Sequence, residues 1–364
     1  MAPNWVAPNW VAPAETPGAE VHVAIYLPLV VPLFAALAAR PLADRLPPAA
    51  ATWLLAASAM ALALASSAVL GLLALSALVR IPFVDALGHL SRPVISSGDA
   101  VSVPVAIVAG GLLVMAVVAA SRAVWRRGRA IAAAHRHASS LPGAGQIVVT
   151  EDSAADAYTV PGWPCRIVIT QGMLRALSAG EREVLLAHER SHAQGSHYLF
   201  TSVARLAAAV NPLLRPVAAQ AGYTVERWAD ERAAAQAGDR NLAARAVARA
   251  ALATSAAPPD RDAAMTALGL ITQDREPRAG EPGAGEPRAG EPRAKQPRAG
   301  RHRGDRHRAG PVPRRVAALL APPPRMRLVL LAAAIVLVAI SGGAALEAAR
   351  NLHELIELAQ GQAA

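Results

Sequence analysis

Four long apolar runs constrain this chain more than any other feature. They cover residues 21–39, 50–79, 100–121 and 328–346, and none contains Asp, Glu, Lys or Arg. A helix needs about 20 apolar residues to cross a bilayer, so each run is long enough, and the prolines of the first run are tolerated in membrane helices. Together with a hydrophobic fraction of 54%, they predict a mainly α membrane protein with four transmembrane helices rather than a soluble protein with buried helices.

The arginines beside these runs predict the orientation. Five follow the third run and four precede the last: Arg122, Arg126, Arg127, Arg129 and Arg136, then Arg314, Arg315, Arg325 and Arg327. Because basic residues are enriched in cytoplasmic segments, the region between the third and fourth runs should lie in the cytoplasm. Both termini of this multi-pass cell-membrane protein should then be external.

Composition divides the rest of the chain. We expect a disordered tail (1–20), three spans (21–125), a cytoplasmic domain (126–274), a disordered basic linker (275–326), the fourth span (327–347) and a short external tail (348–364). The linker repeats Glu-Pro-Arg-Ala-Gly and cannot bury enough apolar surface to fold. Its charge suits anionic lipid, and nothing in it resembles a base-reading module, so the bilayer is an expected partner and specific nucleic acid is not.

The cytoplasmic region contains His188-Glu189-Arg190-Ser191-His192. On a helix, residues four apart lie on one face, so His188 and His192 can present two imidazoles to one zinc ion. Glu189 lines the same place without binding the metal, and it can take a proton from water whose pKa zinc lowers to about 7. Ser178, followed three residues later by Glu181, forms a capping-box pattern that predicts a helix start near residues 177–179.

A third ligand is sought downstream. His197 gives a pattern that falls one residue short of the metzincin spacing, whereas Glu226 is followed four residues later by Asp230 on the same helical face. Glu226 can bind zinc while Asp230 accepts a hydrogen bond from the far nitrogen of a ligating histidine. We therefore prefer Glu226 and keep His197 as the alternative ligand.

With segments 157–162 and 166–170, these motifs resemble the BlaR/MecR-type membrane zinc metallopeptidases, over residues 145–235 and in the arrangement of spans. The resemblance implies Zn²⁺ held by His188, His192 and Glu226, with Glu189 as general base and Asp230 as the orienting residue. It also implies an α+β, zincin-like (gluzincin-like) domain between the third and fourth spans. The expected activity is that of a zinc metalloendopeptidase in regulated proteolysis or signalling, cleaving a protein substrate such as a transcriptional repressor.

Two alternatives stay open. One is an HtpX-type quality-control protease, whose relatives place membrane hairpins between the two motifs. The other is a non-catalytic membrane scaffold with a structural zinc site. Segment 198–222 is interrupted by Arg and Pro, so we expect a helix packed in the domain or lying at the membrane surface rather than a span.

Smaller expectations concern the sheet and the reaction. Residues 146–150 and 166–170 are β-branched and bounded by Gly or Pro, which predicts two strands, and the second is expected to hold the substrate in extended form. The candidate oxyanion donors are Tyr223, Arg227 and His197. Cys165, the only cysteine, is expected to be structural, because a thiol ligand conflicts with a His-His-Glu set.

Overall fold

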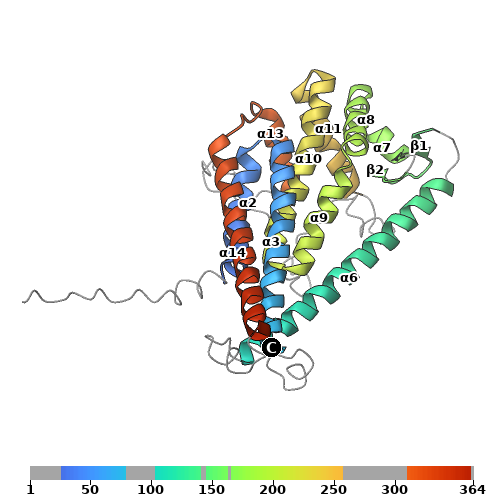
Figure 1. The fold of residues 1–364 in the computed structure, drawn as a ribbon. Coiled ribbons are helices and arrows are strands. Elements are labelled where there is room, and N and C mark those ends of the chain that lie inside the picture. The colour runs from blue at the N-terminus through green and yellow to red at the C-terminus, as the bar shows by residue number, and fades with distance from the viewer. Residues whose placement is uncertain (1–25, 79–102, 141–144, 163–164, 257–309, 362–364) are drawn as a thin grey trace, which may run out of the picture.

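A computed structural model describes residues 26–78, 103–140, 145–162, 165–256 and 310–361 (Figure 1). The N-terminal tail, the loop between the second and third apolar runs, and the Glu-Pro-Arg-Ala-Gly repeats lie outside these residues. The predictions for those segments are therefore not addressed by the structure.

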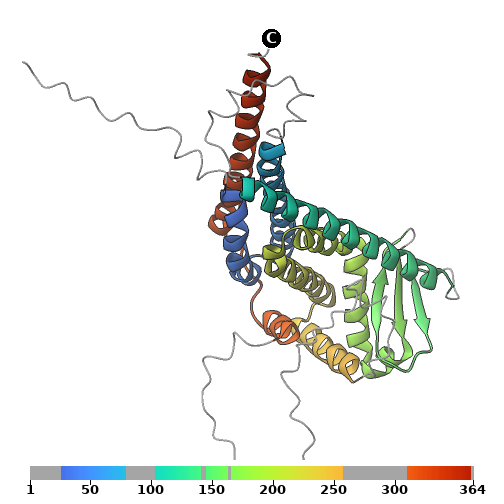
Figure 2. The same cartoon turned by 90° about the horizontal axis from the view of Figure 1, so that it is seen from below.

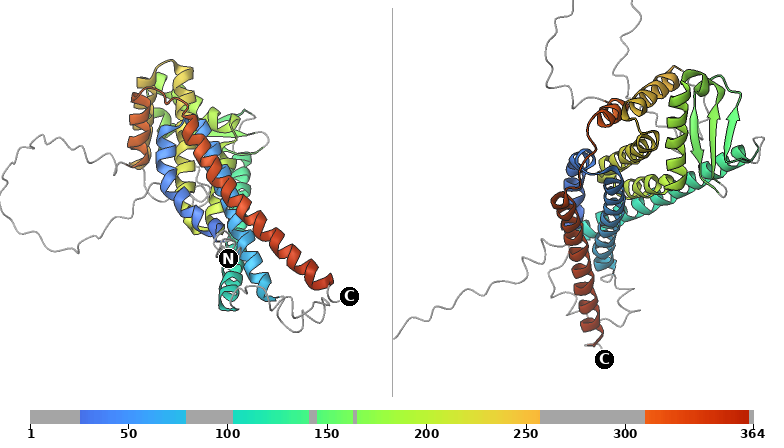
Figure 3. Two further views of the ribbon diagram at one scale, coloured as in Figure 1. Left: turned by 60° about the vertical axis from the view of Figure 1, so that its left-hand side comes forward. Right: turned by 90° about the horizontal axis from the view of Figure 1, so that it is seen from above.

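The described parts of all four apolar runs fall in helices that are long and apolar enough to cross a membrane. These helices are α2 (Leu27–Arg45), α3 (Pro48–Leu78), α6 (Val103–Ser140) and α14 (Leu328–Gly361). Helix α14 packs along α2 and α3 and extends beyond them (Figure 3). Many large apolar side chains of α6 and α14 face outward, such as Ile107 and Val329, which are 68% and 81% exposed. Such surfaces suit a hydrocarbon environment.

Helix α6 is longer than its apolar run, because it continues without a break through the predicted boundary at residue 125. Figure 1 shows it leaving the bundle at an angle and carrying the sheet beside its far end. The small side chains of Ala130, Ala134 and Ala138, one turn apart, pack against Tyr158 and Val168 of the sheet. One continuous helix thus joins an apolar span to the sheet.

The sheet has three strands: β1 (Ile147–Thr150), β2 (Ala157–Val160) and β3 (Arg166–Thr170). Their order is β1-β3-β2, with β1 parallel and β2 antiparallel to β3. Side chains alternate between the two faces, so Val168 meets α6 while Ile167 and Ile169 meet the helices on the other face. Figure 2 shows the strands side by side, with α6 crossing them.

The two predicted strands are confirmed, but the role expected for segment 166–170 is wrong. This segment is β3, the central strand, and it has a strand partner on each side. Its backbone is used within the sheet, so it cannot pair with a substrate chain. Both β2 and β3 contact the helix bearing the two histidines, and β2 is an outer strand of the sheet.

That helix is α8 (Ala179–Gln194), which follows the short α7 (Gln171–Ala176). It begins where the capping box predicted, with Ser178 as its N-cap. The Ser178 backbone N–H donates to the Glu181 carboxylate over 2.9 Å, and Arg249 of helix α11 (Arg240–Ser255) pairs with the same carboxylate. Glu181 is thus buried but satisfied, and it fixes the start of the helix.

A helical hairpin follows: α9 (His197–Val210), the 3-10 turn η1 (Pro212–Leu214) and α10 (Arg215–Ala237), which leads to α11 (Arg240–Ser255). The hairpin packs along α2 and α3 rather than forming a separate domain core. Thr224 shares a hydrogen bond with Thr52 of α3, Arg227 donates to the Ala43 carbonyl of α2, and Asn211 donates to Ser66. Segment 198–222 is therefore a packed hairpin, and it lies against the apolar helices themselves.

A helix also forms inside the predicted linker 275–326, which corrects that part of the prediction. This helix, α13 (Pro311–Leu320), packs on α11 through Val316 and the fully buried Leu319. Arg240 of α11 donates to the carbonyls of Ala318, Leu319 and Ala321 at its end. These carbonyls have no partner within α13, so the guanidinium caps the helix. Composition alone hid this helix because its partners lie some 70 residues or more upstream.

Candidate metal centre

His188 and His192 lie one turn apart on α8 and turn their rings toward a common point. Their Nε2 atoms are 3.0 Å apart, and their ring centroids are 4.7 Å apart. The four-residue spacing that motivated the prediction therefore gives convergent nitrogens in the structure.

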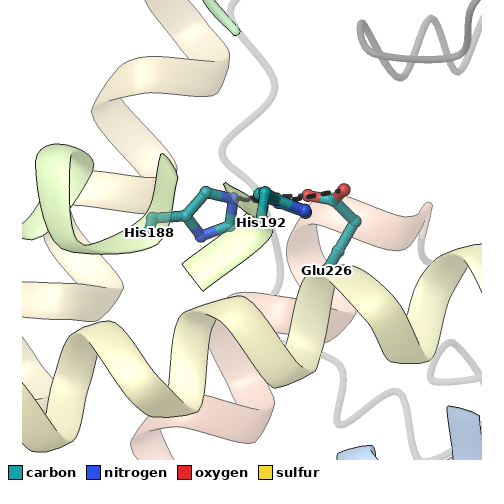
Figure 4. A group of neighbouring side chains, drawn as sticks. All are labelled: His188, His192 and Glu226. Atoms are coloured by element: carbon teal, nitrogen blue, oxygen red, sulfur yellow. Dashed lines mark hydrogen bonds and ion pairs between the residues drawn. The ribbon is translucent and has the colours of Figure 1, made fainter. Parts of the chain in front are cut away.

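Glu226 reaches the same point from α10. Its two carboxylate oxygens lie 3.6 Å from the Nε2 atoms of His188 and His192, one oxygen to each. Figure 4 shows the three side chains meeting, two from one helix and one from another. Among the residues that the structure describes, these three form the group able to hold a metal ion.

The donor set fits zinc. Two imidazole nitrogens and a carboxylate oxygen are ordinary zinc ligands, and ligands about 2.0–2.2 Å from a tetrahedral ion stand roughly 3.3 Å apart. The separations of 3.0, 3.6 and 3.6 Å lie around that value. Three protein ligands leave one coordination position open, which is the arrangement of catalytic rather than structural zinc sites.

Asp230 lies behind His188, where the sequence expected an orienting carboxylate. Its Oδ1 atom is 3.0 Å from His188 Nδ1, the ring nitrogen that points away from the cluster. A carboxylate in this place holds the ring and keeps the proton on Nδ1, which leaves the Nε2 lone pair for a metal. Asp230 is one turn after Glu226 on α10, so one helix supplies both acids.

Arg315 was missed as a site residue. It comes from α13 and makes two 2.7 Å bonds to the Asp230 carboxylate and one 3.0 Å contact with Glu226 Oε2. The sequence suggested for this residue only a place in the basic flank of a span. The sequence could have indicated that Arg315 lies near the start of a short helix that begins with a proline. It gives no sign that this helix contacts Asp230, which lies 85 residues earlier.

Burial and opposite charge compete at every group of this network. Burial alone would raise the pKa of both acids, but Arg315 and the histidines outweigh it and hold the pKa of Glu226 well below its usual range and that of Asp230 at about 2. Burial likewise opposes the charged form of His188, yet Asp230 and Glu226 raise its pKa to about 10 in the metal-free protein. The arginine and the protonated histidine thus balance the two carboxylates.

Glu189 is buried on α8 beside the cluster and is not one of its three ligands. The Thr159 hydroxyl of β2 lies 2.8 Å from its carboxylate and donates to it. Burial raises the pKa of Glu189, although His188 and Thr159 partly offset this. A carboxylate with a raised pKa is a better proton acceptor near neutral pH, which suits a general base.

His197, the alternative ligand, lies behind His192 and outside the cluster. Its Nδ1 is 3.1 Å from His192 Nδ1, on the side of that ring facing away from Glu226. Burial lowers the pKa of His192 to about 4 and that of His197 to about 3, so both rings are neutral at pH 7.

The other two candidate oxyanion donors are engaged elsewhere. Arg227 donates to the Ala43 carbonyl of α2 and is almost fully buried there. Tyr223 lies under the guanidinium of Arg314, whose Cζ is 3.9 Å from the ring centroid. Arg315, 3.0 Å from Glu226, is the cation nearest the cluster among these arginines. Cys165 is a free thiol bonded to the Val160 carbonyl beside β3, which agrees with a structural role.

A comparison with protein families gives one match. The sequence model of peptidase family M48 matches residues 120–322, more than half of the chain. The matched segment runs from α6 through α13 and so contains every residue of the centre, Arg315 included. No curated protein and no solved structure matches the chain. The match does not confirm the narrower BlaR/MecR-type resemblance, which stays a prediction.

Proposed function

The chain belongs to peptidase family M48, a family of metallopeptidases, and we propose that it is a membrane-anchored zinc endopeptidase that cleaves a protein substrate at the cytoplasmic side. The convergence of two imidazole nitrogens and one carboxylate oxygen, with Glu189 buried beside them, carries this proposal. A purely structural zinc site has no need of that extra carboxylate and is normally closed by four protein ligands. The scaffold alternative is therefore the weaker one.

Each side chain has a distinct role in the proposal. His188, His192 and Glu226 would hold the zinc ion, and Asp230 orients His188. Bound zinc supplies Lewis-acid chemistry, which polarises the scissile carbonyl and makes water more acidic. Glu189 takes the proton of the attacking water and later delivers it to the leaving amine. The Thr159 hydroxyl, 2.8 Å away, donates to the Glu189 carboxylate and holds it in place.

The substrate is proposed to lie along β2 rather than β3. Strand β2 is at the edge of the sheet, and its Thr159 contacts the general base. An extended peptide beside an edge strand is held by main-chain pairing, which does not depend on its sequence. Such binding would bring successive peptide bonds past Glu189 without a requirement for one particular side chain.

The membrane placement rests on the apolar helices and their arginine flanks. Four helices are suited to crossing a bilayer, and the basic residues after the third and before the fourth favour a cytoplasmic peptidase with both termini external. A cytoplasmic protein, such as a repressor cleaved in response to a signal, is the substrate that this placement favours, with the bilayer as the second partner.

One observation favours a second candidate. The hairpin α9-η1-α10 stands between the two ligand motifs and packs along α2 and α3. HtpX-type quality-control proteases also have hairpins between the two ligand motifs. A protease of that type would act on many misfolded membrane proteins rather than on one regulatory target.

The substitution Glu189→Gln tests the enzymatic assignment. In the full-length protein purified in detergent, it should leave zinc content unchanged and reduce cleavage of an unfolded test protein by about 10²–10⁴-fold, because only the base is lost. Glu183→Gln, an exposed acid on the same helix, is the matched control and should cleave normally. Unimpaired cleavage by Glu189→Gln would overturn the assignment.

The same variant separates the two candidates in cells. Peptides released by the intact protein and absent with Glu189→Gln should come from one cytoplasmic protein if the protease is regulatory. A broad set of membrane-protein fragments would instead support the quality-control role.

A further inference from the structure

His197 is the buried residue of this region that the proposed mechanism does not use. It is the first residue of α9, only 1% of it is exposed, and its ring lies between two neighbours. The ring centroids of His192 and Trp228 are 4.9 and 4.6 Å away. Trp228 belongs to α10, two residues after Glu226. His197 therefore contacts both helices that carry the metal cluster.

A specialised turn delivers this ring. Helix α8 ends at Gln194 with Gly195 as its C-cap, and Ser196 then adopts a left-handed conformation with φ 48°, which is uncommon for a residue other than glycine. Gly195 itself has an ordinary helical backbone, so its missing side chain matters for space rather than for conformation. A Cβ there would stand 2.4 Å from His197 Nε2 and 2.6 Å from Cδ2. The turn thus folds the His197 ring back onto the last turn of the metal helix.

In the contact between the His192 and His197 rings, it is clear which nitrogen donates the hydrogen bond and which accepts it. His192 points Nε2 at His188 and Glu226, and its Nδ1 is 3.1 Å from His197 Nδ1. A neutral imidazole that offers its Nε2 lone pair to a metal carries its proton on Nδ1. That proton must be donated to His197 Nδ1, which then acts as the acceptor.

The other nitrogen of His197 argues against a space-filling role. Its Nε2 is buried and has no hydrogen-bond partner among the residues that the structure describes. An unsatisfied buried donor costs about 1–3 kcal/mol, and an apolar ring or chain would avoid this cost. This observation favours a use for the other ring nitrogen, Nδ1.

We propose that His197 is a positioning residue that accepts the Nδ1 proton of His192 and so directs the His192 Nε2 lone pair into the metal cluster. This inference rests on the zinc site of the proposed function. It assigns to His192 the kind of support that Asp230 gives to His188, but from an uncharged partner.

Two nearly isosteric substitutions test the role. Asn places an acceptor oxygen near the former Nδ1, whereas Leu has the same shape without an acceptor. Zinc affinity of the full-length protein, measured by competition with a chelator, should fall about 10–100-fold in His197→Leu. His197→Asn should stay close to the unsubstituted protein. Both variants lose the ring and leave the same space, and thermal unfolding of the metal-free proteins checks that each of them is folded.

Gly195→Ala provides a test that keeps the histidine. The added Cβ forces the ring away from its place, so zinc affinity should fall here too, whereas Gly222→Ala adds a Cβ into open space and should leave it unchanged. This pair decides the question if His197→Leu does not fold. Equal zinc affinity in His197→Leu and His197→Asn, or in both glycine variants, would overturn the positioning role.

His188→Ala separates this inference from the proposed function. It should abolish zinc binding if the metal site is real. Retained binding in His188→Ala, or none in the unsubstituted protein, means that the proposed function itself is wrong. Loss in His188→Ala with equal affinity in the Leu and Asn variants means that only the role of His197 is wrong.

Discussion

The two histidines of α8 are equivalent in sequence, but their outer nitrogens face opposite kinds of environment. His188 Nδ1 meets Asp230, which Arg315 grips with two bonds. His192 Nδ1 meets His197, a neutral ring in the turn that follows the same helix. One histidine is supported by a charged network assembled from three helices, and the other by a local turn.

The difference follows from the charge that each side must accommodate. Glu226 and Asp230 bring two carboxylates into a poorly solvated place, and a cation with several donors is needed to make that tolerable. Arg315 of α13 provides this cation with its planar guanidinium group. Its side chain is only 12% exposed. The outer nitrogen of His192 faces His197 rather than one of these carboxylates, so a neutral imidazole is sufficient there.

Removing Arg315 should have the largest effect, because it disrupts the charged network behind His188. Arg315→Ala leaves two buried carboxylates without their main counter-charge, and we expect a loss of about 3–5 kcal/mol in unfolding free energy. Denaturant unfolding of the purified protein measures it. Arg314→Ala is the control, since its ion pair is with the half-exposed Asp44 and should cost only about 1–2 kcal/mol. Equal losses in the two variants would show that the network does not support the site.

Replacing Asp230 or His197 by Asn compares directly how the two residues support His188 and His192. Asp230→Asn keeps the shape and an acceptor oxygen but removes the charge, so zinc affinity should drop about 10–100-fold. His197→Asn should change it little, because that contact is between neutral groups. Chelator competition measures both.

Glu231→Gln serves as the control for the first substitution. Glu231 is the next residue of α10, but it pairs with Arg240 rather than with the cluster. Unchanged affinity in Asp230→Asn would mean that the charge behind His188 is dispensable and that the two histidines are supported alike.

The pH dependence of stability offers the smallest and most specific test. In the metal-free protein, the pKa of His188 is raised from 6.5 to about 10. This group therefore contributes stability that is fully present below pH 6.5 and is lost as pH rises toward 10, by at most about 1.4 kcal/mol per unit. His192 and His197 have lowered pKa values and stay neutral throughout that range. Unfolding of the chelator-treated protein between pH 6.5 and 9 measures the slope.

Asp230→Asn should flatten that profile, because the carboxylate is the main partner that holds the proton on His188. Bound zinc should flatten it as well, since the ion replaces the proton. A profile that is already flat in the metal-free protein would contradict the charged network.

Features that depend on neighbours within one or two turns could be predicted from the sequence. The paired histidines, the Ser178 start of α8, two of the strands and the four apolar helices all follow from local spacing, capping and hydropathy, which act through residues close in the chain. Glu226 and Asp230 were found for the same reason, as two acids one turn apart.

Tertiary structure decided which elements meet. That β3 is central and β2 lies at the edge depends on strand order, which side-chain alternation does not encode. Arg315 reaches Asp230 only because α13 folds back onto α11, and α9 and α10 lie along α2 and α3 through contacts with residues far apart in sequence. The sequence by itself determined the three candidate ligands and the helix that bears two of them. The fold determined what stands behind each candidate ligand, because that support comes from side chains brought together only by long-range packing or, for His197, by the left-handed turn at Ser196.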